Sequence, residues 1–141
     1  MADIDWAILC DYAFLDVGRK TCVIGIFNRI FSKAVPAVHH QAALVVRFTG
    51  NPGEDVMFKV EIIRPLTSGQ GAIGSFQGAA KLGDNGAGEV TTNIAGLPLP
   101  DYGDYAFNIH VGEKLVKVVT FSVVPLPEAS GEGQAPPSPK N

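Results

Sequence analysis

The most regular alternation of apolar and polar positions lies in residues 101–124, on either side of Gly112-Glu113. A Gly-X pair between two alternating runs is typical of a two-residue hairpin turn, because glycine accepts the positive φ that the twist of such a turn requires. The turn predicts an unshifted register in which Tyr105 faces Thr120. One face of this hairpin should then carry the apolar residues Tyr105, Phe107, Ile109, Val111, Val116 and Val118.

The alternation changes phase beyond Val118, where the apolar set becomes Val119, Phe121 and Val123. A β-bulge would produce this change, because one extra residue on a strand reverses the faces that follow it. Burial of the strand on both faces would produce the same pattern. The sequence leaves both explanations open.

The segment just before the hairpin, DYGDYAF at residues 101–107, resembles the start of the sixth strand of immunoglobulin-type domains, D-x-G-x-Y-x-C. Phe107 stands where that motif has its cysteine. The resemblance implies that the ring of Tyr105 is buried and that its hydroxyl is bonded to backbone upstream. An aromatic core residue in another kind of β-sheet would give the same local pattern.

Residues 6–13 and 20–31 are rich in strand-forming side chains and are separated by a turn near Gly18. Residues 23–27 are apolar on both parities, which predicts that 20–31 is a central strand covered on both sides. Gly25 inside this run indicates a bulge or a close approach of backbone. Residues 32–40 should be an irregular crossover, because Pro36 removes a donor and restricts Val35.

Residues 41–49 and 56–63 both alternate and are joined by a short turn, which predicts a second hairpin with its charged residues facing water. Residues 73–80 are expected to form an edge strand, and residues 89–94 a further strand. No segment has the 3.6-residue periodicity of an amphipathic helix. The fold class that follows is all-β: an antiparallel, immunoglobulin-like or fibronectin-like β-sandwich of seven or eight strands.

The composition suits one domain, since the 141 residues are 46% hydrophobic and 18% charged. We assign residues 1–125 to the β-sandwich. Residues 126–141 are rich in Pro and Gly and contain no aromatic residue, so we expect a flexible tail. A docking peptide in the polyproline II conformation is the alternative.

The net charge of -3, without a basic cluster, argues against nucleic-acid binding, which needs Lys and Arg to neutralise phosphates. The N-terminal residues lack the pattern of a secretory signal, and no apolar run has the length of a membrane span, so we expect a cytoplasmic protein that binds no membrane. In that compartment Cys10 and Cys22 should be reduced, and we expect buried thiols.

No pattern typical of a catalytic site occurs, neither a nucleophile elbow nor a phosphate-binding glycine loop. We therefore expect a protein that is not an enzyme and needs no cofactor. His39 and His40 are adjacent, so in an extended chain their rings point to opposite faces and cannot share a metal ion without a local turn.

Three segments together resemble a bacterial family of small single-domain proteins of unknown function: ILCDYA at residues 8–13, VIGIFNRIF at 23–31 and PAVH at 36–39. The resemblance extends over residues 6–124 and implies a β-rich bacterial cytoplasmic domain, without a reaction or ligand. Four polar residues in or next to these segments form our candidate site: Asp11, Arg29, His39 and His40. Pairing of Asp11 with Arg29 would make either a functional site or a structural ion pair.

The hypothesis that follows is a noncatalytic binding or protein-interaction module, whose edge strand or loops engage a protein partner or a second copy of the chain. Two alternatives remain open. One is a small-ligand or metal binder with its site near the first two strands and the Pro36 crossover. The other is a structural subunit of a larger assembly.

Overall fold

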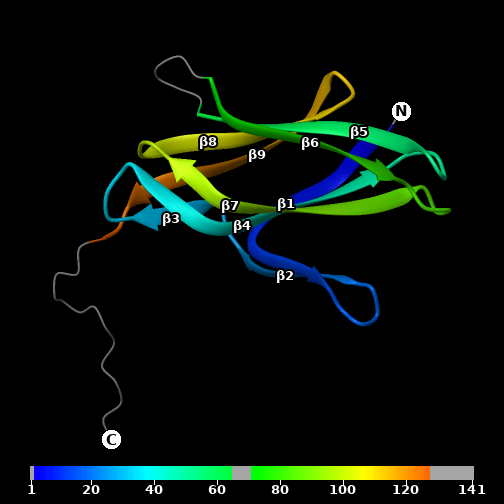
Figure 1. Cartoon of the computed structure of the whole chain (residues 1–141), viewed down its shortest axis with the longest axis horizontal. Helices are drawn as coiled ribbons and strands as arrows, with labels where there is room; N and C mark the ends of the chain where they lie inside the picture. The colour runs from blue at the N-terminus through cyan, green and yellow to red at the C-terminus, as the bar shows by residue number, and fades with distance from the viewer. Residues whose placement is uncertain (1, 65–70, 128–141) are drawn as a thin grey trace, which may run out of the picture.

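The computed structural model describes residues 2–64 and 71–127, which form two β-sheets packed face to face (Figure 1). Nine strands lie in these residues. They are β1 (Asp3–Leu15), β2 (Thr21–Ile26), β3 (Arg29–Ser32), β4 (Ala37–Thr49), β5 (Asp55–Ile63), β6 (Ala72–Lys81), β7 (Ala87–Leu99), β8 (Gly103–Val111) and β9 (Lys114–Pro125). The predicted tail lies outside the described residues from residue 128 onward. No helix in the described part of the chain has the length and hydrophobicity needed to cross a bilayer.

The first sheet has the strand order β2-β1-β4-β7 and the second has the order β3-β9-β8-β5-β6. All neighbours are antiparallel except β3 and β9. The predicted all-β sandwich is confirmed. The strand count exceeds the expected seven or eight because the run 20–31 breaks at Phe27-Asn28, where the chain crosses from the first sheet to the second.

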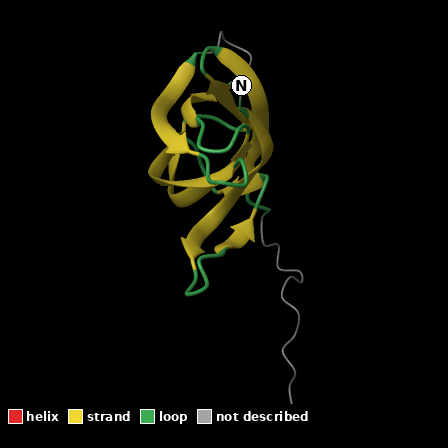
Figure 2. Ribbon diagram, turned by 90° about the vertical axis from the view of Figure 1, so that its right-hand side faces the viewer, coloured by secondary structure: helices red, strands yellow, loops and turns green. Residues whose placement is uncertain are grey.

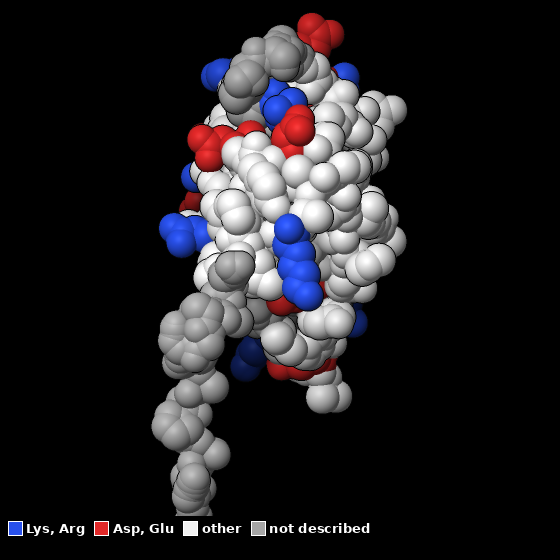
Figure 3. All heavy atoms as spheres, turned by 90° about the vertical axis from the view of Figure 1, so that its left-hand side faces the viewer, with Lys and Arg blue, Asp and Glu red and all other residues white. Residues whose placement is uncertain are grey.

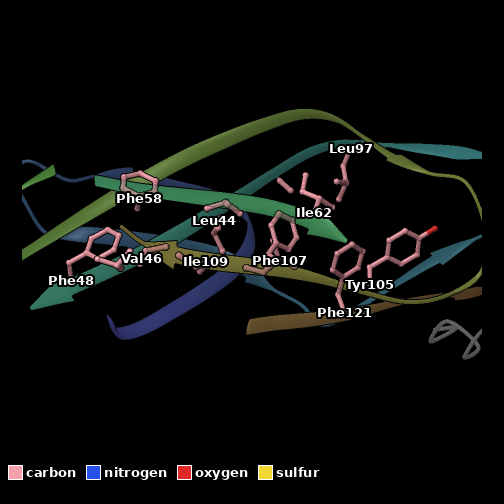
Figure 4. Packing of buried hydrophobic residues seen from close by; sticks show 14 of the residues in the cluster. Leu44, Val46, Phe48, Phe58, Ile62, Leu97, Tyr105, Phe107, Ile109 and Phe121 are labelled. Carbon is pink, nitrogen blue, oxygen red and sulfur yellow. The ribbon is translucent and has the colours of Figure 1, made fainter. Parts of the chain in front are cut away.

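The core lies between the two sheets and is lined by the inward-facing residues of their strands (Figure 4). Tyr105 is completely buried, and its ring stacks on Phe121 with centroids 5.1 Å apart. The Tyr105 hydroxyl donates a 2.6 Å hydrogen bond to the carbonyl of Asp101 and accepts a 3.0 Å bond from the Asp101 N–H. The ring burial and the upstream backbone bond expected for Tyr105 are therefore both present.

The phase change in the C-terminal hairpin is caused by a β-bulge. The register shifts after Ile109, which faces Lys117, so that Val116 is the extra residue of β9. Tyr105 consequently faces Phe121, and the predicted unshifted partner Thr120 is wrong. Val118, which we expected in the core, is 45% exposed for the same reason.

The predicted second hairpin is wrong, because β4 and β5 belong to different sheets. β4 pairs with β1 and β7, whereas β5 pairs with β6 and β8. The short turn between β4 and β5 carries the chain across the sandwich, and the alternation within each strand is the same in a crossing as in a hairpin. The predicted edge position of residues 73–80 is confirmed, since β6 ends the second sheet.

Two expectations for the N-terminal region are also wrong. Residues 20–26 do not form a covered central strand: β2 is the edge of the first sheet, and Ile24 and Ile26 are 53% and 66% exposed. His39 and His40 do not lie in an irregular crossover, because β4 begins at Ala37, directly after Pro36. Strand pairing with β7 across Ala37↔Leu99 holds this segment extended.

Candidate functional site

The first sheet divides at the residue where β1 stops pairing with β4, and we call this point the fork. The two strands pair from Asp3↔Thr49 to Cys10↔Ala43, and beyond that point β1 pairs only with β2. β4 continues in the other direction with β7 alone. The β1–β2 hairpin therefore projects beyond the two sheets, at the lower end of the ribbon in Figure 2.

Two glycines with positive φ mark the fork. Gly25 (φ 75°) lies opposite Asp11, and Gly96 (φ 79°) lies opposite His40. A side chain at Gly25 would come within 2.5 Å of the Asp11 carboxylate, so the close approach expected at this glycine is present. The alternation of side chains along β1 reverses at this point. Cys10 and Ala13 are three residues apart and would point to opposite faces of a regular strand, yet both pack in one cluster on the outer side of the sheet.

The fork brings together two of the four predicted site residues. Nε2 of His39 lies 3.8 Å from Oδ1 of Asp11, and the His39 ring packs against Phe27 with centroids 5.4 Å apart. This Nε2 is buried and has no hydrogen-bond partner among the described residues. The expected pairing of Asp11 with Arg29 is wrong, because Arg29 lies in β3 of the second sheet and Asp11 pairs with His39. His40 is exposed on β4.

The nearest thiol is not activated. Cys10 is fully buried, and the carbonyls of Tyr12 (3.3 Å) and Ala43 (3.7 Å) both lie within hydrogen-bond distance of its Sγ, where they can accept its single proton. Burial, and then the negative charge of Asp11, raise the pKa of this thiol, which keeps it protonated. Cys22 is half-buried, and both cysteines are free. Among the described residues no group of three or more His, Cys, Asp or Glu side chains lies close enough to hold a metal ion.

The β1–β2 hairpin has one face turned to the sheet and one turned to solvent. Ala13 and Val23 pack against the cluster of Cys10, Ala43 and Val45. The other face, which we call the hairpin face, consists of the cross-strand pairs Tyr12↔Ile24 and Phe14↔Cys22. Its large apolar members are about half exposed: Tyr12 54%, Phe14 49% and Ile24 53%.

The hairpin face is not expected from the sequence. The available signal is the uncharged run 21–26, which is apolar on both parities beside a turn and also fits an exposed edge. Burial on both sides is the usual environment of such a run, because an apolar strand is more often covered. The exposure of residues 21–26 follows from the separation of β1 from β4, and that separation depends on the distant strands β4 and β7.

Polar contacts fix the hairpin against the sheet. The hydroxyl of Thr21 donates to the carboxylate of Glu89, which in turn pairs with Arg47 at 2.9 Å. Arg47 also contacts Asp5 at 3.3 Å. A groove of about 720 Å³ lies between the hairpin and the outer side of β4 and β7. Its lining includes Phe14, Arg19, Thr21, Glu89, Thr91 and Asn93.

Charges do not gather by sign on the face shown in Figure 3, where Lys and Arg are interspersed with Asp and Glu. The hairpin face itself carries no charged side chain. Its surface is therefore apolar, with aromatic rings next to a half-buried thiol.

Comparison with known proteins places this geometry in context. The model of a family of unknown function, DUF6941, matches residues 5–124. No curated protein matches the chain. Among solved structures, the chain is similar to the crystal structure of a GH3 beta-glucosidase from Bifidobacterium adolescentis, with 10% identity and a TM-score of 0.51. That match covers 99% of this chain but only 18% of the enzyme, so it shows the fold alone.

Proposed function

Because the chain belongs to DUF6941, a family of unknown function, we propose its function from the geometry: a noncatalytic protein-interaction module whose binding element is the β1–β2 hairpin. The observation that carries the proposal is the hairpin face, which is turned to solvent with Tyr12, Phe14 and Ile24 half exposed. A contiguous exposed apolar patch on a soluble domain is typical of an interaction site.

The energetic argument concerns what contact would remove from water. Half-exposed aromatic and aliphatic side chains each present on the order of 100 Å², and burial of apolar area contributes roughly 25 cal/mol per Å². Covering three such residues would therefore contribute on the order of 7 kcal/mol, which is comparable to the costs of association that a complex must offset.

The hairpin is also held in one position, which favours binding because less conformational freedom is lost on contact. Ala13 and Val23 pack on the sheet, and Thr21 is bonded to Glu89. We place this module in the bacterial cytoplasm. Its two free cysteines suit a reducing compartment, and its net charge of -3 does not favour nucleic acid. The Tyr105 corner supports an immunoglobulin-like hairpin motif.

Site-specific photocrosslinking in cells tests the proposal. A photoreactive phenylalanine analogue replaces Phe14 in the full chain, and the matched control places it at Met57, which is 64% exposed on the second sheet. We expect a discrete protein adduct from position 14 and none from position 57. Adducts of equal yield from both positions, or from neither, would contradict the proposal.

The groove between hairpin and sheet favours a second candidate, a small-ligand binder. Arg19, at the hairpin turn, is a non-glycine residue with φ 65°, a conformation that carries strain and is enriched at functional sites. Its side chain lines the groove together with the hydroxyls and amides named above. A thermal shift with metals and metabolites, lost in Arg19→Ala, would support it; the absence of any shift would remove its support.

A further inference from the structure

We infer that the occupant of the hairpin is a second copy of this chain, paired through antiparallel β2 strands about a two-fold axis at Val23. The inference rests on the proposed function and names its partner. The pairing would extend the first sheet of each copy into one continuous sheet across the axis. The hairpin extends from the end of the first sheet, at the lower end of the ribbon in Figure 2.

The edge of β2 is unprotected. In the described part of the chain, no strand pairs with its outer side. Edge strands commonly carry a charged residue or a proline that discourages pairing with another chain. The other three edges have such residues: Arg29 in β3, Lys81 in β6, and Glu89 and Pro98 in β7. β2, with the sequence TCVIGI, has none.

The ladder of the hairpin determines which backbone groups are free. The N–H of Asp16 donates to the carbonyl of Lys20 at 2.9 Å and closes the hairpin. Hydrogen-bonded and non-bonded pairs alternate along an antiparallel ladder, so the backbone groups of Thr21 and Val23 turn away from β1. Two β2 strands centred on Val23 would exchange these bonds. Cys22 of each copy would then lie opposite Ile24 of the other, at a non-hydrogen-bonded position.

The register sets no like charges against each other. Lys20 would lie opposite Ile26 of the partner, and Asp11 belongs to β1, one strand further from the axis. A two-fold interface must be self-complementary, and an uncharged centre without like charges in contact meets that requirement.

The contact area comes from the edge of β2 itself. The exposed parts of Ile24 and Ile26 amount to about 200 Å² per copy, while Tyr12 and Phe14 of β1 stay on the outward face of the joined sheet. With the backbone edges and flanking side chains, the pair would bury on the order of 1,000 Å², the lower end of specific interfaces. The chain's own residues 128–141 do not suit this surface, since they contain no aromatic residue and no Leu, Ile, Val or Met.

A disulfide trap tests the register. Cys22 is the native thiol, and Ile24→Cys would place a second thiol opposite it across the axis. Facing residues at a non-hydrogen-bonded position have Cα atoms about 4.5 Å apart, within the range of a disulfide. We expect Ile24→Cys to form a covalent dimer on mild oxidation and to lose it when Cys22→Ser is added. The matched control Met57→Cys should stay monomeric on a non-reducing gel.

Light scattering of the full chain completes the test. We expect wild-type protein at twice 14.9 kDa and Ile24→Lys at 14.9 kDa, because the variant sets two cations near the axis, while Met57→Lys should remain dimeric. A wild-type chain that is monomeric at high concentration, or a dimer that survives Ile24→Lys, would overturn the inference. A monomer that still crosslinks a foreign protein from position 14 would leave the proposed function standing. A monomer without crosslinks would refute both.

Discussion

Substitution of Gly25 by alanine probes the fork from which the hairpin projects. Gly25 has φ 75°, and an added Cβ would lie 2.5 Å from Oδ2, 3.0 Å from Cγ and 3.1 Å from Cβ of Asp11. The substitution therefore imposes two costs. The backbone conformation is unfavourable for any L side chain, and the Asp11 carboxylate must move away from its place beside His39.

The size of each cost follows from the geometry. Alanine in the left-handed region costs about 1 kcal/mol or slightly more. Displacing Asp11 adds an overpacking cost of about 1–2 kcal/mol. Together these predict a loss of about 2–3 kcal/mol in the free energy of unfolding, which lowers the Tm of a domain of this size by about 8–12 °C.

Gly53→Ala is the matched control, because Gly53 has φ 74° and no atom within 4 Å of an added Cβ. It should lose only the backbone part, about 1 kcal/mol. Urea unfolding of both variants and of the double variant Gly25→Ala/Asp11→Ala measures the difference. The reasoning predicts that Asp11→Ala relieves part of the Gly25→Ala cost. Equal destabilisation by Gly25→Ala and Gly53→Ala, without coupling to Asp11, would refute it.

Two further predictions concern Tyr105 and Cys10. Tyr105→Phe removes a hydroxyl that bonds both the N–H and the carbonyl of Asp101, so it should lower the free energy of unfolding in urea by about 1–3 kcal/mol. The control Tyr102→Phe loses a single, less buried bond to the Ser32 carbonyl and should cost less. A larger loss for Tyr102→Phe than for Tyr105→Phe would contradict the role assigned to Tyr105. The pKa of Cys10 is raised above its ordinary value of 9.0, so the unfolded chain loses this proton at lower pH than the folded chain. The free energy of unfolding should therefore be at its full value below pH 9 and fall as the pH rises through the folded pKa, with a smaller fall in Cys10→Ala. Identical profiles of unfolding free energy against pH for the two proteins would contradict the shift.

The strands were largely predictable because their alternation is a local property. Residues 6–13, 41–49, 56–63, 73–80 and 89–94 all lie within observed strands. The pairing was less predictable, since a short turn can close a hairpin or carry the chain between sheets. The turn after Thr49 does the second, held by the distant bond from the Gly50 N–H to the Gly86 carbonyl.

The candidate site was predictable only in part. Asp11 and His39 were singled out as polar residues in apolar segments, and the structure brings them together. A pairing of Arg29 with Asp11 requires residues 20–31 to form one strand beside residues 6–13. The break at Phe27-Asn28 sends Arg29 to the other sheet, and no residue in the run marks that break unambiguously.

The exposure of the hairpin face was the least predictable feature, because it depends on tertiary structure. Tyr12 and Phe14 alternate with smaller residues, as they would in a strand whose apolar side faces the core. Their exposure follows from the divergence of β1 and β4 after Cys10, which requires Gly25 and Gly96 in register with Asp11 and His40. Such a juxtaposition of four strands cannot be derived from the local pattern of any one of them.

Amide hydrogen exchange of the full chain at increasing protein concentration tests the central claim most directly, because it reports every edge strand at once. The account predicts that exchange at Thr21 and Val23 slows as concentration rises, while exchange along the other edges, β3, β6 and β7, does not change. Exchange in β2 that is independent of concentration, or new protection confined to another edge, would contradict the claim that the hairpin is where this protein binds its second copy.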